Sequence, residues 1–215
     1  MIKAITLLFA LLGLATAAQA QDVKAGQAKA FQCIGCHGIV GYQASFPEIH
    51  KVPMISGQNA KYIAASLTAY RKGERKHPSM RAIAGSMSDQ DIADIAAFYE
   101  GQGQGAMKPV ADAGAVAPTP AVAALLAKGA CVSCHGANFN KPIDASYPKV
   151  AGQHRDYLYV ALTAYATEGN PQVGRGNAIM AAQVKQFKRS ELKALADYMG
   201  SLPGDLQVVP QSRLR

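Results

Sequence analysis

The sequence is short of the large aromatic residues that usually fill the core of a small domain. It contains no tryptophan, and aromatic residues make up only 7% of its 215 positions. Charged residues reach 17% and hydrophobic residues 49%, a balance that excludes an intrinsically disordered chain. A folded chain of this composition needs another large apolar group in its core, and a bound cofactor would supply one.

The sequence also lacks a hydrophobic run of the roughly 20 residues that a membrane-spanning helix needs. Its N-terminus has Lys3, a short apolar run over 5–14 and the small-x-small sequence Ala18-Gln19-Ala20. This order is typical of a cleaved secretory signal, whereas a retained anchor would need a longer run. We therefore predict a signal peptide over 1–20, a mature chain that begins at Gln21, and a periplasmic location.

No cysteine is available for an ordinary disulfide framework. The four cysteines form two identical motifs, Cys33-x-x-Cys36-His37 and Cys131-x-x-Cys134-His135, and none is left over. Cys-x-x-Cys-His is the attachment signal for c-type haem, with two thioether bonds from the cysteines and an iron ligand from the histidine. The sequence therefore predicts two covalently bound haem c groups, held by Cys33, Cys36, Cys131 and Cys134 and ligated by His37 and His135.

Two other uses of the motif fit the sequence less well. A thioredoxin-like redox pair needs a βαβ context, and no run of residues here alternates in hydrophobicity as strands do. A structural zinc site needs four ligands, and each motif supplies three.

The two motifs belong to a duplicated domain. They begin 98 residues apart, and other segments recur in the same order at similar distances. Leu67-Thr68-Ala69-Tyr70 recurs unchanged over 162–165, and a Pro-x-x-x-Gly-Gln sequence occurs at 53–58 and again at 148–153. A stretch rich in Gly, Ala and Pro separates the copies and reads as a linker. We predict an N-terminal domain over 21–103, a linker over 104–120 and a C-terminal domain over 121–215.

Each copy contains three stretches with helical periodicity. In the first copy they cover 23–31, 59–73 and 89–100. Ser88 followed by Asp91 resembles a capping box at the start of the last one, and Ser190 with Glu191 starts its counterpart. The sequence therefore predicts an all-α protein made of two tandem domains.

The repeat also selects the second axial ligand of each iron. A methionine thioether is a soft donor, and the first copy offers Met54, Met80 and Met87. Only Met80 has a methionine at the matching position, Met180, so these two are the predicted ligands. Met87 and Met199 are interpreted as core residues, because Met fills irregular gaps.

The remaining histidines are weaker candidates. His77 lies three residues before Met80 in a very polar stretch, which favours a solvated side chain, and His154 is expected at the surface. His50 stays open as a further candidate ligand. Metal-bound histidines usually donate their other ring nitrogen to an acceptor, and we predict that the carbonyls of Pro53 and Pro148 accept these bonds.

With these motifs, the chain resembles the dihaem class I cytochromes c of the cytochrome c4 family. The likeness rests on CIGCHG and CVSCHG, on the repeated Gly-Gln before a helix with tyrosine, and on Met80 followed by the sequence from Ser88 to Asp94. It implies two small helical domains that face each other about an approximate two-fold axis. The sequence departs from the family in its long linker and in an extended loop over 39–52.

The resemblance implies an electron carrier rather than an enzyme. Its expected partners are redox proteins, namely a terminal oxidase, a quinol–cytochrome c reductase or a dehydrogenase. The alternatives are a fixed cytochrome subunit of a flavin- or quinone-dependent dehydrogenase, and a haem enzyme such as a peroxidase, which would need an open iron position.

The charge distribution bears on these partners. Residues 21–105 hold nine Lys or Arg against seven Asp or Glu, and residues 106–215 hold twelve against seven. For an exported chain, a basic surface favours an acidic protein or peripheral membrane contact over nucleic acid. One basic cluster close to Met80 either steers an acidic partner or is simply solvated; it contains Arg71, Lys72, Arg75, Lys76 and Arg81.

Overall fold

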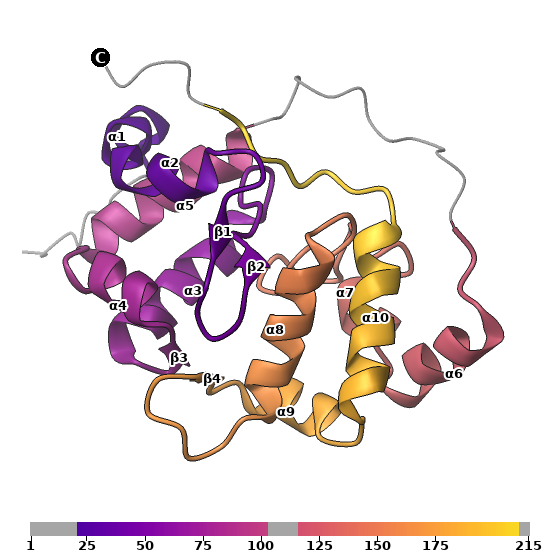
Figure 1. Cartoon of the computed structure of the whole chain (residues 1–215). Coiled ribbons are helices and arrows are strands. Elements are labelled where there is room, and N and C mark those ends of the chain that lie inside the picture. The colour runs from indigo at the N-terminus through magenta and orange to yellow at the C-terminus, as the bar shows by residue number, and fades with distance from the viewer. Residues whose placement is uncertain (1–20, 103–115, 211–215) are drawn as a thin grey trace, which may run out of the picture.

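The computed structural model describes residues 21–102 and 116–210 as two helical domains that lie side by side (Figure 1). The N-terminal domain contains the helices α1 to α5, and the C-terminal domain contains α6 to α10. The predicted signal peptide and most of the predicted linker fall outside the described residues. The extended segment after α10 runs back to the N-terminal domain, where Gln207 forms an isolated bridge with Ser56.

The same five helices occur in each domain in the same order. The three predicted helical stretches of each copy are present. The two short helices of each domain that carry the site residues were not predicted. The helices of the N-terminal domain are α1 (Val23–Lys29), α2 (Phe31–His37), α3 (Ala60–Lys72), α4 (Pro78–Gly85) and α5 (Asp89–Gly101). Those of the C-terminal domain are α6 (Pro120–Lys128), α7 (Val132–His135), α8 (Arg155–Ala166), α9 (Ala178–Val184) and α10 (Arg189–Ser201).

The last helix of each domain starts at a carboxylate that caps the backbone. At α5 the predicted capping box is confirmed: the Ser88 hydroxyl accepts from the Asp91 N–H at 3.1 Å, and the Asp91 carboxylate accepts from the Ser88 N–H at 2.9 Å. At α10 the N-cap is Lys188, two residues before the predicted start, and its N–H donates to Glu191 at 2.6 Å. Both helices therefore begin with an acidic group near the positive end of the helix dipole.

Each domain has its own apolar core. In the N-terminal domain α3 and α5 bury Ile63, Leu67, Ile92 and Ile95, and in the C-terminal domain α8 and α10 bury a matching set that includes Leu158, Leu162, Leu192 and Leu195. Met87 and Met199 are buried in these cores, at 5% and 6% exposure, as predicted.

The strands are only two residues long, so the all-α class holds. The extended loop over 39–52 forms a hairpin of β1 (Gln43–Ala44) and β2 (His50–Lys51), and β2 packs against α8 of the other domain (Figure 1). β3 (Arg75–Lys76) pairs antiparallel with β4 (Gly174–Arg175) and so joins the two domains.

Candidate haem-binding sites

Both attachment motifs lie on the short helix that follows the first helix of the domain. Cys33, Cys36 and His37 belong to α2, while Cys134 and His135 belong to α7, with Cys131 as its N-cap. None of the four cysteines is in a disulfide, so each is available for a thioether bond. One helical turn therefore presents two sulfurs and an imidazole together, which is the arrangement that two thioether bonds and an iron ligand require.

The two motif histidines are oriented by the same hydrogen bond in both domains. Nδ1 of His37 lies 2.8 Å from the Pro53 carbonyl oxygen, and Nδ1 of His135 lies 3.0 Å from that of Pro148. Both predicted acceptors are confirmed. Because a carbonyl can only accept, each Nδ1 carries the proton, and Nε2 is left with a lone pair suited to a metal.

The surroundings keep these histidines neutral. Burial lowers the pKa of His37 more than its bond to Pro53 raises it, and burial likewise lowers the pKa of His135. A neutral imidazole is the form that ligates a metal. Burial also raises the pKa of the Cys33 thiol to about 11 and that of the Cys131 thiol above its usual value.

The predicted axial methionines lie in the same neighbourhood. Met80 packs against the core of the N-terminal domain together with Cys33, and Met180 packs against that of the C-terminal domain together with Cys131. Each methionine is in the first turn of its helix, α4 or α9, and its N–H is capped by the residue three positions earlier. The cap is His77 Nδ1 at 3.4 Å in one domain and Asn177 Oδ1 at 2.9 Å in the other.

The other histidines have structural contacts of their own. The expectation that His77 is simply solvated is wrong, because its ring caps α4 and makes an edge contact with Phe46 at 5.9 Å. His50 is 4% exposed and its Nδ1 lies 2.8 Å from the Glu48 carbonyl oxygen. His154, expected at the surface, is half-buried at the start of α8.

A symmetric cluster of arginine and tyrosine lies between the domains. Arg75 donates to the Tyr157 hydroxyl at 2.8 Å and to the Ser66 hydroxyl at 2.8 Å, and Arg175 donates to the same tyrosine at 3.2 Å. The rings of Tyr70 and Tyr165 stack against the guanidinium groups at 4.7 Å and 5.2 Å. Burial alone would raise the pKa of Tyr157, but the two nearby positive charges outweigh burial and lower it.

The basic stretch near Met80 was expected to form one surface, and the structure shows that it does not. Arg75 is only 9% exposed, and Arg71 pairs with Asp89 and donates to the Met87 carbonyl. A run of charges looks solvated in a sequence, and here tertiary packing buries one of them. The repeat could have identified Arg75 as a structural residue, because Arg75 matches Arg175 at the same spacing as Met80 and Met180.

Arg75, which is buried, and Arg175, which is half-buried, fit a haem, because its propionate groups are anionic and cationic side chains would pair with them. Within the described part of the chain neither guanidinium has an acidic partner, and Nε of Arg75 is buried without a hydrogen bond. An uncompensated buried charge is costly, so the guanidinium of Arg75, with that of Arg175 beside it, favours an anionic ligand. The zinc alternative has no support in residues 21–102 and 116–210, where no three His, Cys, Asp or Glu side chains gather as metal ligands.

Comparison with known proteins decides the family. The cytochrome c family pattern matches residues 23–101 and 121–203, one match for each domain. Cytochrome c4 of Azotobacter vinelandii is 31% identical over 215 residues, which cover 93% of this chain and 99% of the relative. The chain belongs to the cytochrome c4 family. It accordingly carries two covalently bound c-type haems and is an electron-transfer protein.

One solved structure and one further relative are also similar to this chain. The reduced recombinant cytochrome c4 of Pseudomonas stutzeri has a TM-score of 0.62 and 28% identity, covering 86% of this chain and all of that one. A protein of Stutzerimonas stutzeri named thiosulfate dehydrogenase electron acceptor is 29% identical over 188 residues, or 80% of each chain. None of the helices in the described part of this cytochrome c4 is both long and apolar enough to cross a membrane.

Proposed function

We propose that this cytochrome c4 is a periplasmic electron carrier in which His37 and Met80 ligate one iron and His135 and Met180 ligate the other. Cys33 and Cys36 would attach the first haem, and Cys131 and Cys134 the second. A bound haem supplies a reversible one-electron iron centre. The observation that carries the proposal is the repeat of one geometry in both domains: a histidine fixed by a proline carbonyl, and a methionine in a capped first turn.

The ligand assignment explains why the protein would carry electrons rather than transform a substrate. His37 with Met80 and His135 with Met180 would each supply an imidazole and a thioether to the iron of a bound haem, which would leave no ligand position for a substrate. The neutral imidazoles are held in one orientation by Pro53 and Pro148, so little would need to rearrange when an electron arrives or leaves.

A spectroscopic redox titration of the wild type beside Met80→Ala and Met180→Ala tests the ligands. Each substitution should lower the potential of one haem by on the order of 100 mV or more and remove half of the methionine-to-iron absorption band, because a thioether ligand favours the ferrous state. Met87→Leu is the matched control, since Met87 is a buried core residue of the same domain. Unchanged potentials in the alanine variants would contradict the assignment.

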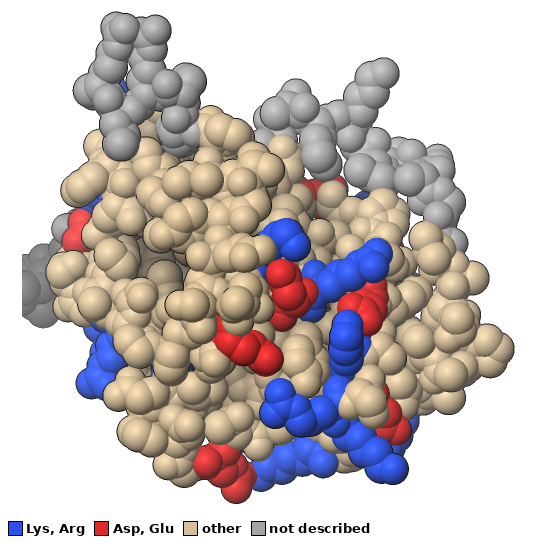
Figure 2. Space-filling view, viewed as in Figure 1, with Lys and Arg blue, Asp and Glu red and all other residues tan. Residues whose placement is uncertain are grey.

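A second basic surface for an acidic partner lies on the C-terminal domain, apart from the exposed Lys72 and Arg81 near Met80. Figure 2 shows Lys and Arg gathered over the side of the molecule where α9 and α10 lie in Figure 1. Four exposed residues of this region form what we call the basic face: Lys185, Lys188, Arg189 and Lys193. Three of them have acidic neighbours, Glu168, Glu48 and Asp197, so the face is mixed rather than purely positive.

A fixed subunit of a dehydrogenase is the second candidate, favoured by the relative that is named a thiosulfate dehydrogenase electron acceptor. Purification at native abundance separates the two. A free carrier should elute alone, and its reduction by a partner should slow as salt is added if the basic face steers encounter. Co-elution with a dehydrogenase through several columns would favour the subunit.

A further inference from the structure

Two buried glutamines cross between the domains in a reciprocal arrangement. Gln58 precedes α3, and Gln153 precedes α8 by two residues; each is only 4% exposed. The side-chain amide of Gln153 accepts from the Met54 N–H at 3.0 Å and donates to the Met54 carbonyl at 2.8 Å. In the mirror-related contact, Gln58 accepts from the Lys149 N–H at 2.9 Å and donates to the Lys149 carbonyl at 2.9 Å.

The residues that these glutamines hold come directly after the two prolines that orient the motif histidines. The peptide group between Pro53 and Met54 accepts from His37 through its C=O and donates to Gln153 through its N–H. The peptide group between Pro148 and Lys149 accepts from His135 and donates to Gln58. Each motif histidine is therefore connected, through one peptide group, to a side chain of the opposite domain.

We propose that Gln58 and Gln153 are positioning residues that set the electron-donating strength of the axial histidine in the opposite domain. Hydrogen bonds in such a chain polarise one another, so a peptide whose N–H donates is a better acceptor at its C=O. A stronger bond from Nδ1–H makes the imidazole more basic and favours ferric iron. Docking of the domains thereby lowers the potential of both haems.

The glutamines are themselves held in place. Oε1 of Gln153 also accepts from the His154 N–H at 3.0 Å, and Oε1 of Gln58 from the Asn59 N–H at 3.1 Å. Each amide oxygen is thus shared between its own helix start and the opposite loop. These contacts fix the orientation of each side-chain amide, because its oxygen accepts from two backbone N–H groups and its nitrogen donates to a backbone carbonyl.

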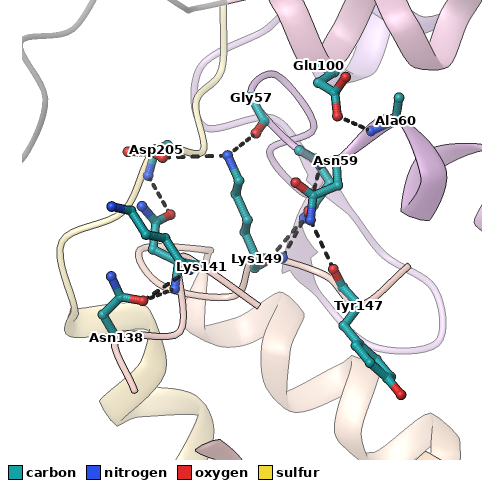
Figure 3. A network of polar contacts seen from close by, with 11 residues as sticks. Gly57, Asn59, Ala60, Glu100, Asn138, Lys141, Tyr147, Lys149 and Asp205 are labelled. Carbon is teal, nitrogen blue, oxygen red and sulfur yellow. Dashed lines mark hydrogen bonds and ion pairs between the residues drawn. The ribbon is translucent and has the colours of Figure 1, made fainter. Parts of the chain in front are cut away.

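Both loops have additional support. Next to the loop of His37, the Asp156 carboxylate of the opposite domain accepts from the Lys51 N–H at 3.0 Å, and the loop of His135 has contacts of its own. Nζ of Lys149 donates to the Gly57 carbonyl at 2.8 Å and lies 3.5 Å from Asp205, and Asn59 donates to the Tyr147 carbonyl at 3.1 Å (Figure 3). Met54, which occupies the matching position in the N-terminal domain, has no charged end and makes no such bond. Each loop is therefore held by its glutamine together with at least one further contact from the opposite domain.

The inference rests on the proposed histidine ligands, and a pair of leucine variants tests it in the full haem-loaded chain. In Gln153→Leu the haem of the N-terminal domain should shift, and in Gln58→Leu that of the C-terminal domain. The ratio of reduced to oxidised haem at a fixed potential should rise about twofold to threefold, less than the loss of a directly bonded partner causes. For a one-electron couple this is roughly 18–28 mV. The two shifts should be of similar size.

Lys24→Ala is the control. It removes one exposed positive charge on α1, which belongs to neither loop, and both potentials should stay constant. Haem-resolved NMR assigns each shift to a domain and follows the ring N–H of each axial histidine. X-ray scattering checks that the domains stay docked; if Gln153→Leu separates them, Gln153→Asn, with an amide one methylene shorter, carries the same test.

The crossed pattern is what distinguishes the inference from a merely structural role. A shift confined to the haem of the mutated glutamine's own domain, an equal shift of both haems, or lower stability with unchanged potentials would overturn it. A chain without bound haem would instead refute the proposed function, and the mass of the exported protein reports that separately.

Discussion

In the N-terminal domain α1 lies so close to α5 that a Cβ at Gly26 would be 2.0 Å from the Asp94 carbonyl oxygen. In the C-terminal domain the matching position, seven residues before the first motif cysteine, is Ala124, and it is exposed. The polar contacts between the first and last helices of the two domains differ as well. Asp94 accepts from the Asp22 N–H, from Lys29 and from Gln90 in the first domain, whereas its counterpart is Ala194.

The features that both domains share are the ones that surround the proposed haem sites. The bond from histidine to proline, the capped methionine turn, the arginine with its tyrosines and the glutamine before the third helix occur in both copies. The packing of the first helix, which lies outside this set, has diverged. Three pairs of substitutions break or sharpen the contrast.

The largest effect is expected from Gly26→Ala. The new methyl group collides with the backbone of α5, which cannot yield as a flexible side chain would, so the free energy of unfolding should fall by roughly 2–3 kcal/mol or more. The matched change, Ala124→Gly, should cost only about 1 kcal/mol through helix propensity. Denaturant unfolding of the haem-loaded proteins compares them. Equal losses would show that the two first helices are packed alike.

Asp94→Asn should have an intermediate effect that depends on pH. The Asp22 N–H and then Lys29 hold the pKa of Asp94 below its usual value, so the folded state favours the charged form. Its contribution is therefore present above about pH 4, the ordinary pKa of the group, and is lost as the pH falls through the lower folded pKa. At pH 7 the variant should lose roughly 1.5–3 kcal/mol.

The control for this change is Asp197→Asn on α10. Asp197 forms an ion pair with Lys193 one helical turn away, and both side chains are well exposed, at 43% and 62%. Its loss should stay within about 0.5 kcal/mol at any pH. A loss for Asp94→Asn that is as large at pH 3 as at pH 7 would contradict the account of the carboxylate.

The smallest effect concerns the two caps of the methionine turns. Asn177→Ala should cost about 1 kcal/mol, as loss of an asparagine N-cap typically does. His77→Ala should cost less, because its bond to the Met80 N–H is 3.4 Å long against 2.9 Å for Asn177. Thermal loss of the methionine-to-iron band measures both. A larger effect at His77 would mean that its ring does more than cap the turn.

The sequence predicts the parts of the site that depend on local chemistry and on the repeat. The attachment motifs, the capping box of Ser88 and the two proline acceptors all follow from residue type and spacing. The short helices α2 and α4 escaped prediction because seven or eight residues show too little periodicity. Their bounds depend on the packing of the surrounding chain.

What the sequence alone did not predict is how the domains meet. Arg75 lies within a charged stretch that looks solvated, and Gln58 is an ordinary polar residue before a helix. Both are buried only because the second domain covers them. The repeat does mark them, since each has an identical partner in the other copy, but it does not say that the partners face one another.

The central claim is that the chain carries one covalently attached haem at each motif. Intact mass spectrometry of the exported protein tests it most directly, alone and with Cys33→Ala/Cys36→Ala or Cys131→Ala/Cys134→Ala. The account predicts a mature chain that carries two haems, and one haem in each double variant. A mass equal to that of the bare polypeptide, from cells able to attach haem, would contradict it.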